Sequence, residues 1–204
     1  MTYQPIQDTD RTVRVQDSAT VFTGAIWNIQ RDTFVMEDGD EELTREYIRH
    51  PGAVAIVAID AQHRVAMIRQ YRHPVGQDCW EIPAGLVDGV GETLLSTAQR
   101  ELAEETDLTA KQWSLLIDHY PSAGSSAEAI RIYLAQDMHP VPKEQRHQRV
   151  GEEAHLILQW VPLTEVLDAV MAGAVKNVNA VAGIMAAHLV LNEHRPTRSL
   201  DSAL

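Results

Sequence analysis

The sequence is poor in cysteine, in basic residues and in long apolar runs, and each shortage excludes a class of protein. A single cysteine, Cys79, allows no internal disulfide framework and favours a reducing compartment. Lys and Arg number 17 against 29 Asp and Glu, and the net charge of -12 argues against a nucleic-acid-binding surface. The longest apolar run, Val178 to Leu191, contains Asn179 and His188 and is too short to span a bilayer.

Two expectations follow from these shortages. The N-terminus, MTYQPIQDTD, has neither the basic start nor the apolar core of a signal peptide, so we expect a cytoplasmic protein that does not enter a membrane. An acidic protein that handles phosphate groups needs a cation to do so, and the charge balance is therefore a first hint of Mg²⁺.

The first fifty residues carry the pattern of β-structure. Residues 12–36 (TVRVQDSATVFTGAIWNIQRDTFVM) are rich in Val, Thr, Ile and aromatics, and Asp38-Gly39 marks a turn. Residues 42–50 (ELTREYIRH) predict a further strand, after which His50-Pro51-Gly52 interrupts the chain. We expect a small N-terminal β-sheet domain over residues 1–50 and a main domain over residues 51–204.

Strand and helix patterns alternate in the main region, which predicts an α/β or α+β fold with a mixed sheet sandwiched by helices. Two apolar strands, 53–60 and 64–72, are predicted to form a central hairpin. The remaining predicted elements are strands at 112–120 and 128–136 joined by the small-residue loop 121–126, a long loop at 137–152, a last strand at 155–163, a short helix capped by Thr164-Glu165 before Gly173, and a helix from about Asn177 to Glu193.

The stretch GLVDGVGETLLSTAQRELAEETDL, residues 85–108, predicts a glycine-rich loop that runs into an acidic helix. At about 100° per residue, Glu105 falls inside the arc of buried leucines, Glu101 lies at its edge and Glu104 lies further out. A solvated charge face would place these carboxylates opposite the leucines. Burying bare carboxylates costs several kcal/mol, and Arg100 can neutralise only one. A divalent cation such as Mg²⁺, held by carboxylates and phosphate oxygens, would compensate the others.

The acidic stretch resembles the Nudix box, G-x5-E-x7-R-E-U-x-E-E-x-G-U, in which U is aliphatic. Glu92, seven further residues and then the run 100–105 (RELAEE) reproduce this pattern. Two departures stand out: Gly85 lies one residue too far from Glu92, and Asp107 takes the place of the late glycine. Since Asp tolerates a left-handed conformation better than most residues, we expect it to end the helix.

The resemblance implies a Nudix-type α/β/α sandwich and the hydrolysis of a nucleoside diphosphate linked to another moiety. It implies that Glu101 and Glu105 bind Mg²⁺ directly, with Mn²⁺ as a possible substitute, and that Glu104 shares or bridges the metal. The carbonyl of Ala84 is a further implied ligand. Arg100 is implied to orient the glutamates by ion pairing.

The flanking sequences narrow the resemblance to the ADP-ribose pyrophosphatase branch of the Nudix family. The segments concerned are RQYRHP at 69–74, WEIPAGLVD at 80–88 and YPSAGSSAE at 120–128. They imply Mg²⁺-dependent hydrolysis of ADP-ribose to AMP and ribose 5-phosphate. In that branch the N-terminal region is a small antiparallel sheet exchanged across a homodimer, where it contributes to both active sites.

The same resemblance implies a set of substrate-binding residues. Arg45 and Glu46 would reach the substrate from the partner subunit, Arg72 would lie near the phosphates, and Glu128 would lie in the loop after the acidic helix. Trp27 offers an aromatic face for adenine. Each has a plainer alternative: a surface ion pair for Arg45-Glu46, a core position for Trp27, and an acidic partner for Arg72.

The general base is implied to be a glutamate on the long loop before the last strand. Glu152 and Glu153, in VGEEAHL, occupy that place, and counting back from the last strand favours Glu152. A loop that closes over bound substrate can assemble the site and exclude water. His147 and His155 lie nearby and are alternatives for this role.

Two alternatives to ADP-ribose hydrolysis stay open. The chain could be a Nudix hydrolase for another nucleoside-diphosphate sugar or a dinucleotide, such as GDP-mannose or NADH, because the sequence does not reveal the base pocket. It could also be a non-catalytic module that senses ADP-ribose-like ligands. Such modules usually lose the box carboxylates or carry a DNA-binding domain, whereas the three glutamates are present here.

Overall fold

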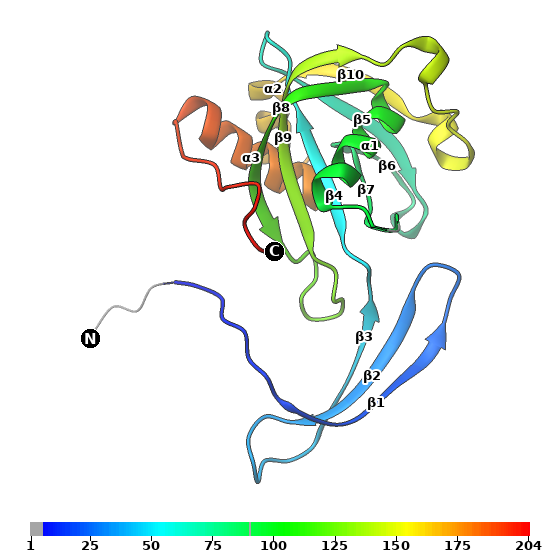
Figure 1. Ribbon diagram of the computed structural model, residues 1–204, viewed down its shortest axis with the longest axis vertical. Helices are drawn as coiled ribbons and strands as arrows, with labels where there is room; N and C mark the ends of the chain where they lie inside the picture. Colours follow the sequence, from blue (N-terminus) through cyan, green and yellow to red (C-terminus); the bar gives the residue numbers. More distant parts are fainter. Residues whose placement is uncertain (1–5, 90) are drawn as a thin grey trace. The chain divides into compact units, whose positions relative to one another are not determined.

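The computed structural model describes residues 6–89 and 91–204, and the chain divides into two compact units (Figure 1). The first unit comprises the chain up to His50 together with Ser122–Ala127, and the second comprises Pro51–Pro121 and Glu128–Leu204. The loop segment belongs to the first unit because the Ser125 carbonyl accepts from the Ile48 amide at 2.9 Å and the Ala127 amide donates to the Ile48 carbonyl at 3.0 Å.

The first unit is a three-stranded antiparallel sheet in the order β1-β2-β3, which confirms the predicted small N-terminal sheet. Its strands are β1 (Arg14–Thr23), β2 (Asn28–Val35) and β3 (Leu43–Arg49). Asp32 links all three strands, since its carboxylate accepts from the Ser18 hydroxyl at 2.6 Å and from the Tyr47 hydroxyl at 2.9 Å. Every residue of β1 is exposed.

The second unit contains a mixed four-stranded sheet, a three-stranded antiparallel sheet and three helices (Figure 1). The mixed sheet has the order β7-β4-β9-β8, and only its β4–β9 pair is parallel. Its strands are β4 (Ala53–Ala58), β7 (Ala84–Leu86), β8 (Leu108–His119) and β9 (Ile130–Pro140). The second sheet has the order β10-β5-β6, with β5 (Arg64–Arg72), β6 (Gln77–Glu81) and β10 (Ile157–Pro162).

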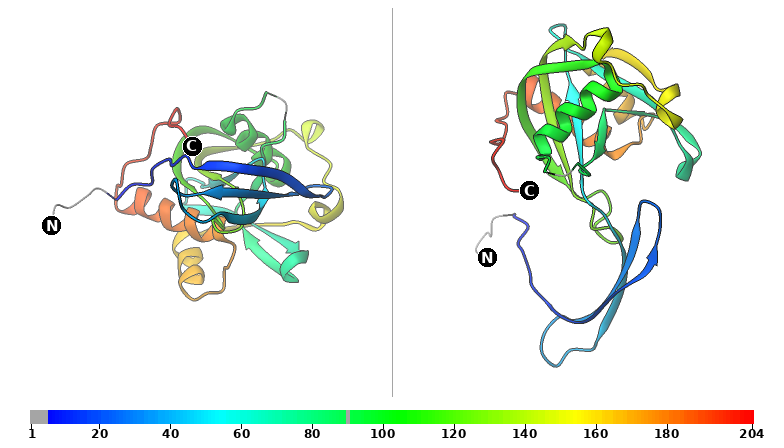
Figure 2. Two further views of the ribbon diagram at one scale, coloured as in Figure 1. Left: turned by 90° about the horizontal axis from the view of Figure 1, so that it is seen from below. Right: turned by 45° about the vertical axis from the view of Figure 1, so that its right-hand side comes forward.

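The helices are α1 (Leu94–Thr106), α2 (Leu163–Met171) and α3 (Val178–Asn192), with single 3₁₀ turns at η1 (His73–Val75), η2 (Lys143–Gln145) and η3 (Gly151–His155). Figure 2 shows α1 on one side of the mixed sheet and α2 with α3 on the other. This arrangement confirms the predicted α/β/α sandwich. Among the helices in the part of the chain described, none has both the length and the apolar character needed to cross a membrane.

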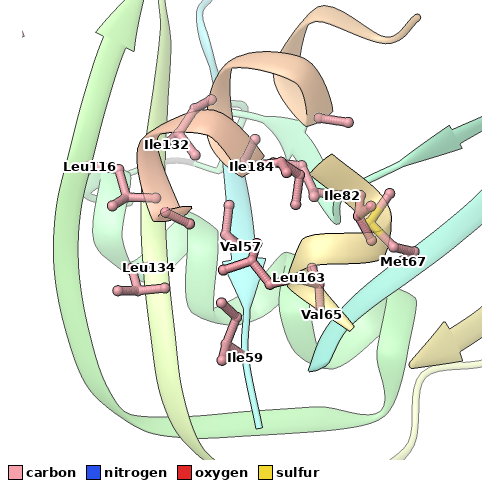
Figure 3. Packing of buried hydrophobic residues seen from close by; sticks show 14 of the residues in the cluster. Val57, Ile59, Val65, Met67, Ile82, Leu116, Ile132, Leu134, Leu163 and Ile184 are labelled. Carbon is pink, nitrogen blue, oxygen red and sulfur yellow. The ribbon is translucent and has the colours of Figure 1, made fainter. Parts of the chain in front are cut away.

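Strand β4 separates two apolar clusters because its side chains alternate between the faces of the sheet. Val57 and Ile59 pack with Leu163 of α2 and Ile184 of α3, as Figure 3 shows. Ile56 on the opposite face packs into a second cluster with residues of α1. All six residues of β4 are buried, so the strand fixes α1 against the sheet.

The predicted central hairpin is wrong, although both of its strands exist. Strand β4 pairs with β7 and β9, whereas β5 pairs with β10 and β6, and a single bridge between Ile59 and Val65 joins the two segments. Both strands are apolar on both faces, so each can lie inside a different sheet. The sequence pattern alone does not distinguish this arrangement from a hairpin.

Several predicted boundaries also differ from the structure. Strand β9 continues to Pro140 and takes the first residues of the predicted 137–152 loop, while β8 begins at Leu108 through pairing with β9. Helix α2 begins at Leu163 after Pro162, so Thr164-Glu165 lies inside the helix and does not cap it. The C-terminal helix agrees with prediction, with Asn177 as its N-cap and its end at Asn192.

Gly183→Ala is expected to destabilise the protein despite its position inside α3. An added Cβ would lie 2.9 Å from Val57 Cγ2 and 3.0 Å from Ile82 Cδ1, both in the packed core. Overpacking costs about 1–3 kcal/mol, whereas replacing a helical glycine by alanine gains about 1 kcal/mol. Urea unfolding should show a net loss of stability, with Gly124→Ala, where a Cβ meets nothing within 4 Å, as the control. A more stable Gly183→Ala variant would contradict this packing argument.

Candidate active site

Helix α1 is fixed at both ends by its own sequence. At its start the Thr93 side chain accepts from the Ser96 amide at 3.1 Å while the Ser96 hydroxyl accepts from the Thr93 amide at 2.8 Å, a reciprocal capping box. At its end Asp107 adopts the left-handed conformation with φ 58°, which confirms its predicted role as the terminating residue. The acidic side chains are thereby presented from a rigid element.

Arg100 is surrounded by the carboxylates of the acidic stretch. Its guanidinium donates to Glu92 at 2.9 Å, to Glu101 at 2.7 Å and to Glu104 at 3.1 Å, and it lies 3.5 Å from Asp88. Glu92 is the main cause of the raised pKa of Arg100, and Arg100 in turn lowers the pKa of Glu92. The ion pairing predicted for Arg100 is therefore present in the structure, and Glu92 joins the loop to the helix.

Glu105 is the most deeply buried carboxylate of α1, with 4% of its surface exposed. Its Oε2 accepts from the Ala84 backbone amide of β7 at 2.9 Å. Burial raises its pKa to about 8, only partly offset by that hydrogen bond, and the charges of Glu101 and Glu153 act in the same direction as burial. Burial likewise raises the pKa of Glu101, against the opposing effect of Arg100. The site thus holds more carboxylates than its own cations neutralise.

Two glycines make room for these carboxylates. A Cβ on Gly85 would lie 2.0 Å from Cδ of Glu101, and a Cβ on Gly89 would lie 2.3 Å from Cδ of Glu92. The backbone of the loop and the two carboxylates therefore pack at distances that only glycine permits. Gly85 has this role even though it is one residue out of place in the Nudix pattern.

Arg72 has an acidic partner, as its plainer alternative expected, and the sequence did not indicate that this partner is Glu81. Its Nε and Nη2 donate to the two carboxylate oxygens of Glu81 at 2.9 and 2.7 Å, and Glu81 is 1% exposed. Glu81 is the first cause of the raised pKa of Arg72, and the charges of Glu105 and Glu152 also contribute, so Arg72 lies within electrostatic reach of both. A lone glutamate between Trp80 and Ile82 was the available signal for Glu81.

The loop that carries Glu152 and Glu153 is tied to the end of α1 by an arginine. Arg149 donates from Nε to the Glu104 carbonyl at 2.8 Å and lies 3.0 Å from the Asp107 carboxylate through Nη2. The two glutamates occupy η3 in different surroundings. The charge of Glu153 contributes to the raised pKa of Glu101 and of Glu105. Glu152 lines a cavity of about 430 Å³ with Arg69, Tyr71, Asp78 and His155.

Most of the predicted substrate-binding residues lie in the first unit. Trp27 stacks on His50 with ring centroids 4.5 Å apart and is 37% exposed, so it is not a core residue. Arg45 and Glu46 do not pair with each other: Arg45 donates to the Thr44 carbonyl at 2.8 Å, and Glu46 pairs with Arg31 across the sheet.

Glu128 lies in the second unit, two residues before β9 begins. Burial lowers the pKa of His119, and the charge of Glu128 acts in the opposite direction, so Glu128 lies within electrostatic reach of His119. The structure thus brings together Ala84, Arg100, Glu101, Glu104 and Glu105, with Arg72 and Glu153 close by in electrostatic terms.

The residues present fit a divalent cation by their chemistry. Glu105 is buried and accepts from the Ala84 amide, and burial is the main cause of the raised pKa of Glu105 and of Glu101. As arranged, no three Asp, Glu, His or Cys side chains of residues 6–89 and 91–204 converge into a cation cage, since Arg100 holds Glu101 and Glu104. Oxygen ligands of this kind suit Mg²⁺, which takes few carboxylates and completes its shell with water and phosphate.

The fold and this site define the class to which the protein belongs. The NUDIX domain family matches residues 49–180, and the chain belongs to that family. The family membership predicted from the acidic stretch is therefore confirmed.

Particular relatives within the family cover most of the chain. It is 41% identical over 185 residues to an ADP-ribose pyrophosphatase of Mycobacterium tuberculosis, covering 91% of this chain and 87% of that protein. It is 32% identical to an ADP-ribose pyrophosphatase of Bacillus subtilis over 76% of this chain and 86% of the relative, and 33% identical to a methanol dehydrogenase activator of Bacillus methanolicus over 78% and 81%. A crystal structure of an ADP compounds hydrolase shares the fold, with a TM-score of 0.75, 18% identity and coverage of 92% of this chain and 98% of that one.

Proposed function

We propose that the protein hydrolyses the pyrophosphate bond of ADP-ribose in a Mg²⁺-dependent reaction that consumes one water and gives AMP and ribose 5-phosphate. The observation that carries the proposal is the pair of largely buried carboxylates, Glu101 and Glu105, that the Nudix helix presents beside the Ala84 backbone, both with a pKa raised by burial. It is supported by the 41% identity to a relative named ADP-ribose pyrophosphatase. The flanking segments that resemble this branch lie at β5, at β6–β7 and in the loop before β9.

Glu101, Glu104 and Glu105, with the carbonyl of Ala84, are the residues that would hold the cation. The cation supplies charge neutralisation of the diphosphate and a lowered pKa of the attacking water. The chain itself supplies position. Arg100 sets the carboxylates of Glu101 and Glu104, and the Ala84 amide sets that of Glu105.

We infer that Glu153, more than Glu152, acts as the general base. Its charge contributes to the raised pKa of both Glu101 and Glu105, which places Glu153 within electrostatic reach of the two carboxylates. Glu152 faces the cavity with Arg69 and His155. The pattern-based preference for Glu152 remains a prediction, and the two assignments are distinguished by experiment.

Glu153→Gln is expected to lower kcat about 100-fold, because a general base contributes roughly 10²–10⁴-fold to a rate. Glu152→Gln should change kcat less than about 5-fold by the same reasoning. The two neutral, isosteric variants control for each other, and kcat against pH should lose its lower, base-dependent limb only in Glu153→Gln. The reverse ranking would restore Glu152 as the base.

Product analysis tests the reaction directly. The purified protein is incubated with Mg²⁺ and ADP-ribose, GDP-mannose or NADH, with a chelator control, and the products are separated by anion exchange. AMP formed from ADP-ribose and lost with chelator supports the proposal. Efficient cleavage of another compound with ADP-ribose left intact would reassign the substrate. Cleavage of none of them would favour the ligand-sensing alternative.

We propose that the protein is cytoplasmic, from its single cysteine and its N-terminal sequence, and, from the family resemblance, that it works as a homodimer in which the N-terminal sheets, residues 1–50, are exchanged. The ten-residue edge strand β1 is exposed throughout, and exposed edges favour pairing with another chain. In this arrangement Trp27, Arg45 and Glu46 would serve the partner's substrate. Two measurements test the exchange. Light scattering gives the oligomeric state, and the activity of mixed Arg45→Ala and Glu105→Gln protomers shows whether one protomer serves its partner's site.

A further inference from the structure

The segment between β9 and β10, residues 141–156, is attached to the C-terminal end of α1. Its first residue, Val141, donates from its amide to the Asp107 carbonyl at 2.8 Å. Further along, Arg149 donates from Nε to the Glu104 carbonyl at 2.8 Å, and its Nη2 lies 3.0 Å from Oδ2 of Asp107. Asp107 therefore holds the segment at two places, through its backbone at Val141 and through its side chain at Arg149.

The end of the helix suits an arginine and does not suit an aspartate. The last carbonyls of a helix lack intrahelical donors, and the negative end of the helix dipole favours a cation. Arg149 supplies both a donor and a positive charge there. Asp107 brings a negative charge to the same end and adopts a φ of 58°, which glycine reaches more readily. The contact with Arg149 is what compensates for this carboxylate.

The course of the chain after Arg149 depends on this contact. The chain turns at Gly151, whose φ is 61°, and the single turn η3 then carries Glu152 and Glu153. In the part of the chain that the structure describes, no side chain of η3 takes part in a hydrogen bond or an ion pair. The next fixed point is Ile157, which begins β10 opposite Arg69 of β5. The turn that carries the two glutamates is thus held from outside, by Arg149 before it and by β10 after it.

We propose that Arg149 and Asp107 are positioning residues for the hydrolysis: their contact holds η3 at the end of α1 and so places the general base. The inference rests on the proposed function for the reaction and for the presence of the base in η3, and it applies to Glu153 and to Glu152 alike. It assigns neither Arg149 nor Asp107 a contact with the substrate. Both residues belong to the second unit, as do α1 and η3.

Cleavage of the full chain by a glutamate-specific protease tests the contact without requiring turnover. The rate of cleavage after Glu152 and Glu153, followed by mass spectrometry, reports how often η3 is released. Arg149→Met keeps the stem of the side chain but cannot donate, and it is expected to raise this rate about 10-fold because charge-assisted hydrogen bonds are lost. Lys143→Met, which removes an exposed cation from the same segment, is the matched control and should equal the wild type.

In turnover, Arg149→Met should lower kcat for ADP-ribose about 10²-fold, because displacing a catalytic group by about 1 Å costs a factor of this size. KM and the affinity for Mn²⁺ should stay within about 2-fold of the wild type, since the carboxylates of α1 keep their places. Arg149→Lys should recover part of the loss, because an ammonium can still pair with Asp107. Asp107→Asn tolerates the left-handed conformation and should lose only about 10-fold, since the Glu104 carbonyl still holds Arg149.

A double variant separates placement of the base from a general structural effect. In the Glu153→Gln background the further loss caused by Arg149→Met should fall from about 10²-fold to less than about 3-fold, because the group that Arg149 positions is already absent. The Glu152→Gln background gives the same comparison for the alternative base. A further loss of about 10²-fold in both backgrounds would overturn the proposal.

Wild-type proteolysis and wild-type hydrolysis in Arg149→Met would also overturn the proposal and would leave the proposed reaction intact. A loss of Mn²⁺ affinity as large as the loss in kcat would contradict it too, since Arg149 would then act on the cation site. Release of η3 in Arg149→Met, together with no cleavage of ADP-ribose by the wild type, would support the contact as the anchor of η3 and refute the proposed reaction.

Discussion

Glu105→Gln is expected to lower the rate of ADP-ribose hydrolysis by about 10³-fold or more, because a cation ligand that stabilises several kcal/mol of transition-state charge is removed. The fold should survive, since the amide is isosteric and its neighbour, the Ala84 amide, can still donate to an oxygen. Circular dichroism and initial rates at saturating Mg²⁺ measure the two effects. Glu165→Gln, an exposed glutamate on α2, is the matched control and should keep full activity. Turnover within a few-fold of the wild type would remove Glu105 from the metal site.

The same variant, Glu105→Gln, is also expected to change how the stability of the folded protein depends on pH. The pKa of Glu105 in the folded protein, about 8, exceeds the ordinary value of 4.5, so ionising it disfavours folding. The resulting loss in the free energy of unfolding is absent below pH 4.5, grows as the pH rises to about 8, and is constant above that pH. Without metal, Glu105→Gln should therefore match the wild type near pH 4.5 and exceed it at pH 8, by up to a few kcal/mol. Denaturant titrations with chelator at both pH values measure this difference. If Glu105→Gln were more stable than the wild type by the same amount at both pH values, the burial argument would be contradicted.

Gly85→Ala is expected to abolish most of the activity with little loss of stability. The added methyl would fall 2.0 Å from Cδ and 2.1 Å from Oε1 of Glu101, atoms at the flexible end of a side chain that can rotate away. Glu101 would then leave both Arg100 and the site. Misplacement by about 1 Å can cost about 10²-fold in rate, and here a whole carboxylate moves, so we expect a loss of about 10²–10³-fold.

The control for Gly85→Ala is Gly124→Ala, where the new Cβ meets nothing within 4 Å. Both variants should unfold at nearly the wild-type denaturant concentration, and only Gly85→Ala should lose activity. Titration with Mn²⁺ by electron paramagnetic resonance adds a direct measure of cation affinity. Retained affinity and rate in Gly85→Ala would show that Glu101 has no part in the site.

The sequence was most informative where one residue's chemistry decides the local structure. The carboxylate of Glu105 was predicted to be buried because of its position on the helix, and Asp107 was predicted to be left-handed because of its intrinsic tolerance; the structure has both features. The strand pairing of β4 and β5 was not predictable in this way. It depends on which distant strand each one meets, and strands that are apolar on both faces carry no alternation to indicate it.

The missed part of the site illustrates the same limit. Glu81 is the buried last residue of β6, a strand that begins with two exposed residues, and its partner Arg72 lies nine residues earlier on the neighbouring strand. Only the register of β5 against β6 brings the two together. Glu152 and Glu153 are neighbours with the same chemistry, and the 3₁₀ turn η3, which a sequence pattern does not specify, gives them different surroundings.

The aspartate at the end of α1 has a consequence for protein engineering. Asp107 occupies the place of a glycine in the family pattern, and it binds Arg149, with Arg146 at 3.9 Å, from the segment that leads to η3. A glycine at 107 would adopt the same backbone conformation and leave both arginines without that carboxylate. A chimaera that takes the helix from a relative with glycine at this place would therefore lose the carboxylate contact of the loop and keep the bond from Arg149 to the Glu104 carbonyl. Positions 107, 146 and 149 have to be exchanged together.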